Sequence, residues 1–163
     1  MDIRKIYGYA LQREIEGKRF FETNAARLSH ATAVAAFKRL AGEEQKHIEY
    51  VQAQINALEA GKTADVAFGL ELDKSGVFSQ RAAAEFIDQT VLEAMVPDLP
   101  VLRMAYLIER DFVEFYEQAA KKTDGEVRQV LETLASWERR HAALFKQLHD
   151  QAFDEYANMP WGG

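Results

Sequence analysis

The stretch Leu131-Glu-Thr-Leu-Ala-Ser-Trp-Glu-Arg-Arg-His-Ala-Ala-Leu-Phe145 decides the fold, because it has the pattern of one amphipathic helix. Its apolar residues recur at helical spacing, and Glu138 and His141 fall in the middle of the same face. Burying such a polar group without a partner costs roughly several kcal/mol. Glu-x-x-His places two of them one turn apart, aimed the same way, so a metal ion is one partner that suits both.

The same pattern occurs a second time in the chain, at a nearly fixed offset. Two Glu-x-x-His pairs lie 94 residues apart: Glu44 with His47, and Glu138 with His141. A single inward-facing glutamate precedes each pair, and these two lie 95 residues apart: Glu14 and Glu109. Each half is therefore predicted to be a helical hairpin that presents one glutamate from its first helix and Glu-x-x-His from its second.

Composition excludes several classes of protein. The chain has 163 residues with 48% hydrophobic residues, which suffices for the core of one domain. No run approaches the ~20 apolar residues of a membrane span, and no secretory signal is recognisable, so we predict a cytoplasmic protein. The absence of cysteine excludes thiolate metal sites, and the net charge of −6 without a basic run argues against nucleic acid.

Hydrophobic periodicity divides the chain into four long helices joined by turns. They are predicted at about 6–28, about 29–60 with Ser29 as N-cap, from Pro100 to the turn at 123–125, and from Glu126 to Ala152 or beyond. Gly17 interrupts the first helix and is typical of a close helix approach, and Gly61 is placed to end the second helix.

The segment between the hairpins is less regular. Residues 64–76 have the pattern of a loop with Gly69 and Asp73 among its turn residues, and a short helix is expected over 80–95. We therefore predict an all-α, single-domain four-helix bundle made of hairpin 6–60, crossover 61–100, hairpin 100–152 and tail 153–163. A long crossover that carries a short extra helix is typical of ferritin-like bundles.

With these residues in place, the chain resembles the ferritin-like di-iron carboxylate proteins, and within them the rubrerythrin group. The resemblance depends on Glu14-Ile-Glu-Gly-Lys-Arg-Phe-Phe21 and Glu109-Arg-Asp-Phe-Val-Glu-Phe-Tyr116, each followed by Glu-x-x-His. It covers about residues 6–60 and 100–152.

The resemblance implies a set of ligands for two metal ions. Glu14 and Glu109 would be terminal carboxylates, Glu44 and Glu138 would bridge both ions, and His47 and His141 would each bind one ion. Tyr116 matches an aromatic residue that the group often places beside the site, with its hydroxyl on a ligand carboxylate. Ordinary core packing is the alternative for Tyr116.

Three departures from the group's pattern affect the expected chemistry. Phe21, equivalent to Tyr116, has no hydroxyl. Phe112 stands where rubrerythrins proper carry an additional carboxylate, and a phenylalanine cannot supply a seventh ligand. No cysteine-based rubredoxin domain is present in the sequence, so we expect a separate electron donor.

Charge explains why two cations suit this site. Four buried carboxylates repel one another unless two divalent ions offset their charge. Carboxylate and imidazole ligands without thiolate favour two iron ions, with manganese or zinc possible. The alternative without metal is a buried network of salt bridges. Glu43 and Trp137, each directly before a predicted bridging glutamate, are candidates to hold the imidazoles.

Three functions remain open from the sequence. The first is an oxidoreductase that reduces hydrogen peroxide or dioxygen with electrons from a separate donor. The second is a ferroxidase or iron-binding protein without an organic substrate, and the third is a metal-stabilised structural or sensing module. A homodimer is the expected assembly. His30 and His149 lack the preceding glutamate and are expected at a turn and near a helix end rather than in the site.

Overall fold

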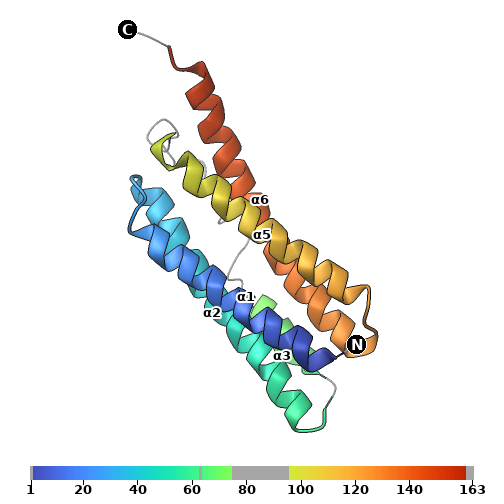
Figure 1. Ribbon diagram of the computed structural model, residues 1–163. Coiled ribbons are helices and arrows are strands. Elements are labelled where there is room, and N and C mark those ends of the chain that lie inside the picture. The colour runs from blue at the N-terminus through green and yellow to red at the C-terminus, as the bar shows by residue number, and fades with distance from the viewer. Residues whose placement is uncertain (1, 63, 75–95, 161–163) are drawn as a thin grey trace.

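The computed structural model describes residues 2–62, 64–74 and 96–160. Five helices lie within these residues (Figure 1), and their bounds are α1 Ile3–Ala25, α2 Ala31–Glu59, α3 Val66–Lys74, α5 Leu99–Ala120 and α6 Gly125–Asn158. None of the described residues forms a strand, so the all-α class is confirmed. No described helix is both long and apolar enough to span a membrane.

The long helices form two hairpins, α1 with α2 and α5 with α6, which lie side by side (Figure 1). The ferritin-like four-helix arrangement is therefore confirmed. The last turns of α6 extend beyond the ends of the other helices. The predicted domain bounds of 6–60, 61–100, 100–152 and 153–163 remain predictions.

Local signals set the helix ends. The side chain of Asp2 accepts a hydrogen bond from Lys5 N at 3.3 Å and caps α1. His30, rather than the predicted Ser29, caps α2, because its Nδ1 accepts from Thr32 N at 3.2 Å. Gly61 adopts the positive φ of 75° that the end of α2 requires, as predicted.

Asp98 links the two hairpins at one end of the bundle. Its carboxylate accepts hydrogen bonds from Ser29 N at 2.8 Å and His30 N at 3.1 Å, and Asp98 itself is only 2% exposed. The α1–α2 turn is thereby held against the start of α5. His30 thus lies in a turn, as expected.

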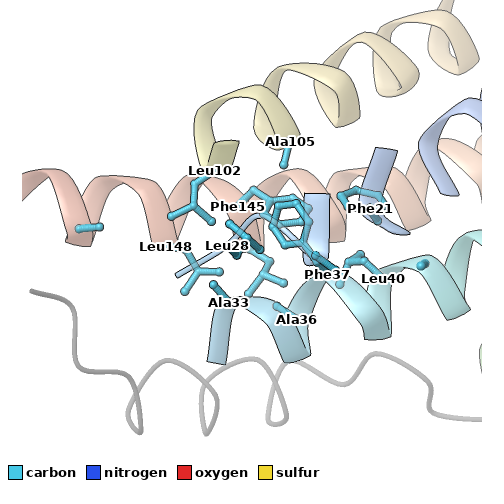
Figure 2. Packing of buried hydrophobic residues seen from close by; sticks show 14 residues of the cluster. Phe21, Leu28, Ala33, Ala36, Phe37, Leu40, Leu102, Ala105, Phe145 and Leu148 are labelled. Carbon is cyan, nitrogen blue, oxygen red and sulfur yellow. The ribbon is translucent and has the colours of Figure 1, made fainter. Parts of the chain in front are cut away.

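Two apolar layers fill the bundle, one near each end. The first gathers the C-terminal half of α1, the N-terminal halves of α2 and α5, and the C-terminal half of α6. Figure 2 shows its side chains converging from all four long helices, among them Phe21, Phe37, Leu102 and Phe145. The second layer lies at the opposite end and includes Tyr7, Tyr50, Tyr116, Leu131 and Trp137. The predicted polar residues lie between these layers.

The helix α3 corrects the prediction of a loop over 64–76. Val66, Phe68 and Leu72 pack against the second apolar layer, which stabilises a helix where single-residue preferences favour turns. Gly69 lies in this helix and allows a close approach to Tyr50 instead of forming a turn, because a Cβ there would lie 2.7 Å from the hydroxyl of Tyr50.

The remaining bounds differ at the ends. The helix α1 lies three residues earlier at both ends than predicted, and α6 continues to Asn158 where a tail from 153 was expected. Apolar contact explains part of this extension, since Ala152 is fully buried in the first layer. The helix predicted over 80–95 falls outside the described residues.

Candidate metal centre

All six predicted ligands lie in the polar layer at the middle of the bundle. The helix α1 supplies Glu14 and α5 supplies Glu109, while α2 and α6 each supply a Glu-x-x-His pair. The four glutamates are 0% exposed, and His47 and His141 are 5% and 2% exposed. The duplicated hairpin therefore directs both copies of the pattern towards one point.

His47 faces three carboxylates through its Nδ1 atom. The distances are 2.8 Å to Glu138 Oε1, 3.2 Å to Glu14 Oε2 and 3.4 Å to Glu44 Oε2. His47 thus joins groups from α1 and α6 to its own helix, α2.

His141 repeats this arrangement from the second hairpin. Its Nδ1 lies 3.2 Å from Glu44 Oε1, 3.4 Å from Glu138 Oε2 and 3.6 Å from Glu109 Oε2. Glu44 and Glu138 therefore approach both histidines, whereas Glu14 lies with His47 and Glu109 lies with His141. The bridging role of Glu44 and Glu138 and the terminal role of Glu14 and Glu109 stay predictions.

The four groups of the two Glu-x-x-His pairs are close enough to share metal ions. One ligand atom from each of Glu44, His47, Glu138 and His141 lies within 4.8 Å of the others. The two imidazole rings are nearly parallel, with centroids 5.2 Å apart. Such a set of mutually close carboxylate and imidazole donors suits iron, manganese or zinc.

Unsatisfied oxygens show that the residues fit a cation. Both carboxylate oxygens of Glu44, Glu109 and Glu138 are buried and accept no hydrogen bond from the described residues, although imidazole nitrogens lie 2.8–3.6 Å away. A buried carboxylate without a hydrogen-bond partner is costly. Divalent cations would satisfy these oxygens and offset the charge of the four glutamates.

The direction of the pKa shift distinguishes Glu14 and Glu109 from Glu44 and Glu138. Burial, with the charges of Glu138 and Glu44 nearby, raises the pKa of Glu14 well above its ordinary value. Burial and Glu138 likewise raise the pKa of Glu109. Burial opposes ionisation of Glu44 and Glu138 as well, but the adjacent imidazoles outweigh it and lower the pKa of both.

For the two imidazoles, burial acts in the direction opposite to that for a carboxyl group and lowers the pKa. Burial disfavours the imidazolium of His47, yet Glu138 and Glu44 raise the pKa of this group well above its ordinary value. The pKa of His141 is also raised despite burial, chiefly by Glu109. Without metal, burial and mutual repulsion therefore favour the protonated form of Glu14 and Glu109, while the two imidazoles favour the ionised form of Glu44 and Glu138.

Tyr116 lies beside the site as predicted. Its hydroxyl donates a hydrogen bond to Glu14 Oε1, and the residue is fully buried. Burial and the neighbouring Glu14 charge raise the pKa of Tyr116 well above its ordinary value, so the hydroxyl keeps its proton. Phe112, which stands in place of a seventh carboxylate, is buried and packs under the guanidinium of Arg13.

A small cavity of about 40 Å³ opens beside the two histidines. It is lined by Glu43, Lys46, His47, Leu72, Asp73, Trp137, Arg140 and His141. Asp73, on α3, accepts hydrogen bonds from Trp137 Nε1 at 3.2 Å and Arg140 at 2.8 Å. Asp73 was expected only as a turn residue and not at the site, because its helix was predicted to be a loop.

The rubrerythrin family model matches residues 100–160, the part of the chain that holds α5, α6, Glu109, Glu138 and His141. Over these residues the chain is similar to rubrerythrin. The first hairpin lies outside that match and joins the same site through the structure, which places its ligands against those of the second hairpin. No curated protein and no solved structure matches the chain.

The rubrerythrin-like domain and the buried cluster support a di-metal carboxylate protein. The structure brings all six predicted residues together, while the ligand role of each residue stays a prediction. His149 lies on the outer part of α6, where it pairs with Asp150 at 3.2 Å, away from the site. The helix continues beyond it, so its expected position near a helix end was wrong.

Proposed function

We propose that this rubrerythrin-like protein is an oxidoreductase that reduces hydrogen peroxide at a di-iron centre, with electrons from a separate donor. The observation that carries the proposal is the cluster of two Glu-x-x-His pairs within 4.8 Å, flanked by Glu14 and Glu109 and open to a small cavity. Two ferrous ions held there would supply the two electrons that cleave an oxygen–oxygen bond.

The size of the cavity favours a small substrate. A volume of about 40 Å³ holds about three water molecules, since one water needs about 10–15 Å³. Pockets for organic ligands are larger, about 300–1,000 Å³. The volume therefore supports hydrogen peroxide or dioxygen rather than a larger organic molecule as the substrate.

The chain's own residues would position the reaction and handle its protons. Each hydrogen peroxide takes up two electrons and two protons and leaves as two water molecules. Tyr116 donates its Oη proton to Glu14 in a hydrogen bond, which fixes that carboxylate. Lys46 and Arg140 line the cavity beside the two histidines. The buried surroundings limit access of bulk water and competing reductants.

A rapid-mixing experiment tests the function. The protein is loaded anaerobically with Fe(II), mixed with hydrogen peroxide, and followed by optical absorption. We expect one peroxide consumed for every two Fe(II), iron retained, and repeated turnover when a small-molecule electron donor is supplied. The control variant Glu132→Ala, which changes an exposed residue of the same helix, should behave like the wild type. Glu138→Ala should lose the reaction.

The same experiment separates the alternatives. A ferroxidase would oxidise Fe(II) with dioxygen at least as fast as with peroxide, and added Fe(II) would be processed beyond two ions per chain. A structural or sensing module would bind metal but oxidise it no faster than free Fe(II) in buffer. Either result would contradict peroxide reduction. The expected cytoplasmic location and homodimer form part of the proposal.

A further inference from the structure

The polar layer consists of two halves that share the bridging glutamates. One half contains Glu14 with His47, whose closest atoms lie 3.2 Å apart. The other contains Glu109 with His141, at 3.6 Å. The ligand types are the same in both halves, so any difference between them must come from the residues around the ligands.

The first difference lies behind the histidines. Glu43 and Trp137 occupy equivalent positions in the duplicated hairpins, each directly before a bridging glutamate. Glu43 Oε2 lies 3.0 Å from Nε2 of His141, while Trp137 stacks on His47 with ring centroids 4.9 Å apart. Only the imidazole of His141 therefore has a carboxylate from this pair of positions on its outer nitrogen.

Glu43 is itself held in place. It is only 5% exposed, and its other oxygen lies 3.3 Å from Nε of Arg39, one helical turn earlier. The indole of Trp137 is directed elsewhere, since its Nε1 donates to Asp73 on α3. The two positions therefore perform different tasks in the folded chain.

The second difference lies behind the terminal glutamates. Tyr116 and Phe21 are equivalent positions, 95 residues apart. The Tyr116 hydroxyl donates to Glu14, so one lone pair of that carboxylate is engaged. Phe21 stacks on Phe145 in the first apolar layer, and neither oxygen of Glu109 accepts a hydrogen bond from the described residues.

Both differences act in the same direction. A carboxylate on the outer nitrogen orients a ligating imidazole and strengthens it as a donor, and losing such a partner costs about 10–100-fold in metal affinity. A hydrogen bond to a terminal carboxylate competes with metal for its electrons. We infer that the Glu109–His141 half binds its divalent cation first and more tightly, with Glu43 as the positioning residue for His141. The Glu14–His47 half then binds second and more weakly.

This inference rests on the proposed di-metal centre, and titration with Co(II) tests it without turnover. The full chain is titrated anaerobically with Co(II) by calorimetry and by visible absorption. We expect two binding steps that differ at least about tenfold in affinity. Glu43→Gln should weaken the first step about tenfold or more and change the spectrum of the first-bound ion, while Tyr116→Phe should strengthen the second step.

Controls make the outcomes distinct. Glu49→Gln, an exposed glutamate on the same helix as Glu43, should leave both steps unchanged. Two equal steps in the wild type, or a Glu43→Gln variant that weakens neither step or both equally, would overturn the inference and leave the di-metal centre intact. Absence of Co(II) binding would overturn both. If circular dichroism shows that Glu43→Gln does not fold, the Tyr116→Phe variant decides. A smaller ratio between the affinities of its two binding steps supports the inference, and an unchanged ratio overturns it.

Discussion

Gly17 of α1 and Phe112 of α5 are equivalent positions in the two hairpins, and they contact each other across the bundle. A Cβ built on Gly17 would lie 3.0 Å from Cε2 of Phe112 and 3.6 Å from Cδ of Glu44. The glycine thus leaves the space that the phenylalanine ring fills directly beside the candidate metal centre. The close helix approach predicted for Gly17 is confirmed.

Gly17→Ala should therefore destabilise the protein. Alanine favours a helix by about 1 kcal/mol over glycine, but overpacking a buried contact costs about 1–3 kcal/mol, so we expect a net loss of about 1 kcal/mol. Gly42→Ala is the matched control, because nothing lies within 4 Å of a Cβ there, and it should stabilise α2. Chemical denaturation measures both. Stabilisation by Gly17→Ala equal to that by Gly42→Ala would refute the close contact.

The internal repeat in the sequence predicted the residues of the polar layer better than the structure of the segment between the hairpins. Glu14 and Glu109 were found because a charged residue on an apolar face at a repeated position is a strong signal, and the bundle brings them together. The helix α3 was missed because Gly69 and Asp73 favour turns locally. What makes α3 helical is its contact with Tyr50 and Trp137, far away in the chain.

The salt bridge between Asp73 and Arg140 should matter for access to the cavity beside the histidines rather than for the stability of the fold. Exposed ion pairs contribute about 0–1 kcal/mol, and these side chains are 51% and 35% exposed. We expect Asp73→Ala to change the free energy of unfolding by less than about 1 kcal/mol. Because Asp73 also holds the indole of Trp137, its loss should speed amide hydrogen exchange in α3.

Mass spectrometry of peptides covering residues 66–74 measures this exchange. Glu117→Ala is the control, since it removes a comparable 2.8 Å pair with Arg139 away from α3. Equal exchange of α3 in the wild type and in Asp73→Ala would show that other contacts hold the helix over the cavity.

The pKa directions predict how pH acts on the metal-free protein. The raised pKa values of Glu14 and Glu109 mean that these groups favour the fold below about pH 4.3, and that their contribution is lost as pH rises. The raised pKa values of His47 and His141 act likewise, with full contribution below about pH 6.5. The lowered pKa of Glu138 favours the fold above about pH 4.3, and this contribution is lost as pH falls.

Stability of the metal-free protein should therefore peak near about pH 4.3 and fall as pH rises towards alkaline values. Metal must displace the protons on these ligands, so its stabilising effect should grow as pH rises. Melting temperatures with and without a chelator, from about pH 5 to about pH 9, measure both trends. Curves that run parallel across this range would be inconsistent with proton displacement from a buried site.

Removal of metal at neutral pH should lower the melting temperature. A ligand that binds only the folded state stabilises it by about 2.7 kcal/mol at about 100 times its dissociation constant. Here the ions would also offset repulsion among the buried carboxylates. Differential scanning calorimetry before and after chelation measures the change. An unaltered melting temperature after confirmed metal removal would show that these carboxylates do not depend on cations.

The most direct test of the central claim is the metal content of the protein after anaerobic loading with Fe(II), determined for the wild type and for Glu138→Ala. Glu138 approaches both histidines, at 2.8 Å and 3.4 Å, so it is the residue on which both ions should depend. We predict two ions per chain in the wild type and in Glu132→Ala, and one or none in Glu138→Ala. Two ions retained at full occupancy in Glu138→Ala, or none in the wild type, would contradict a shared di-metal centre.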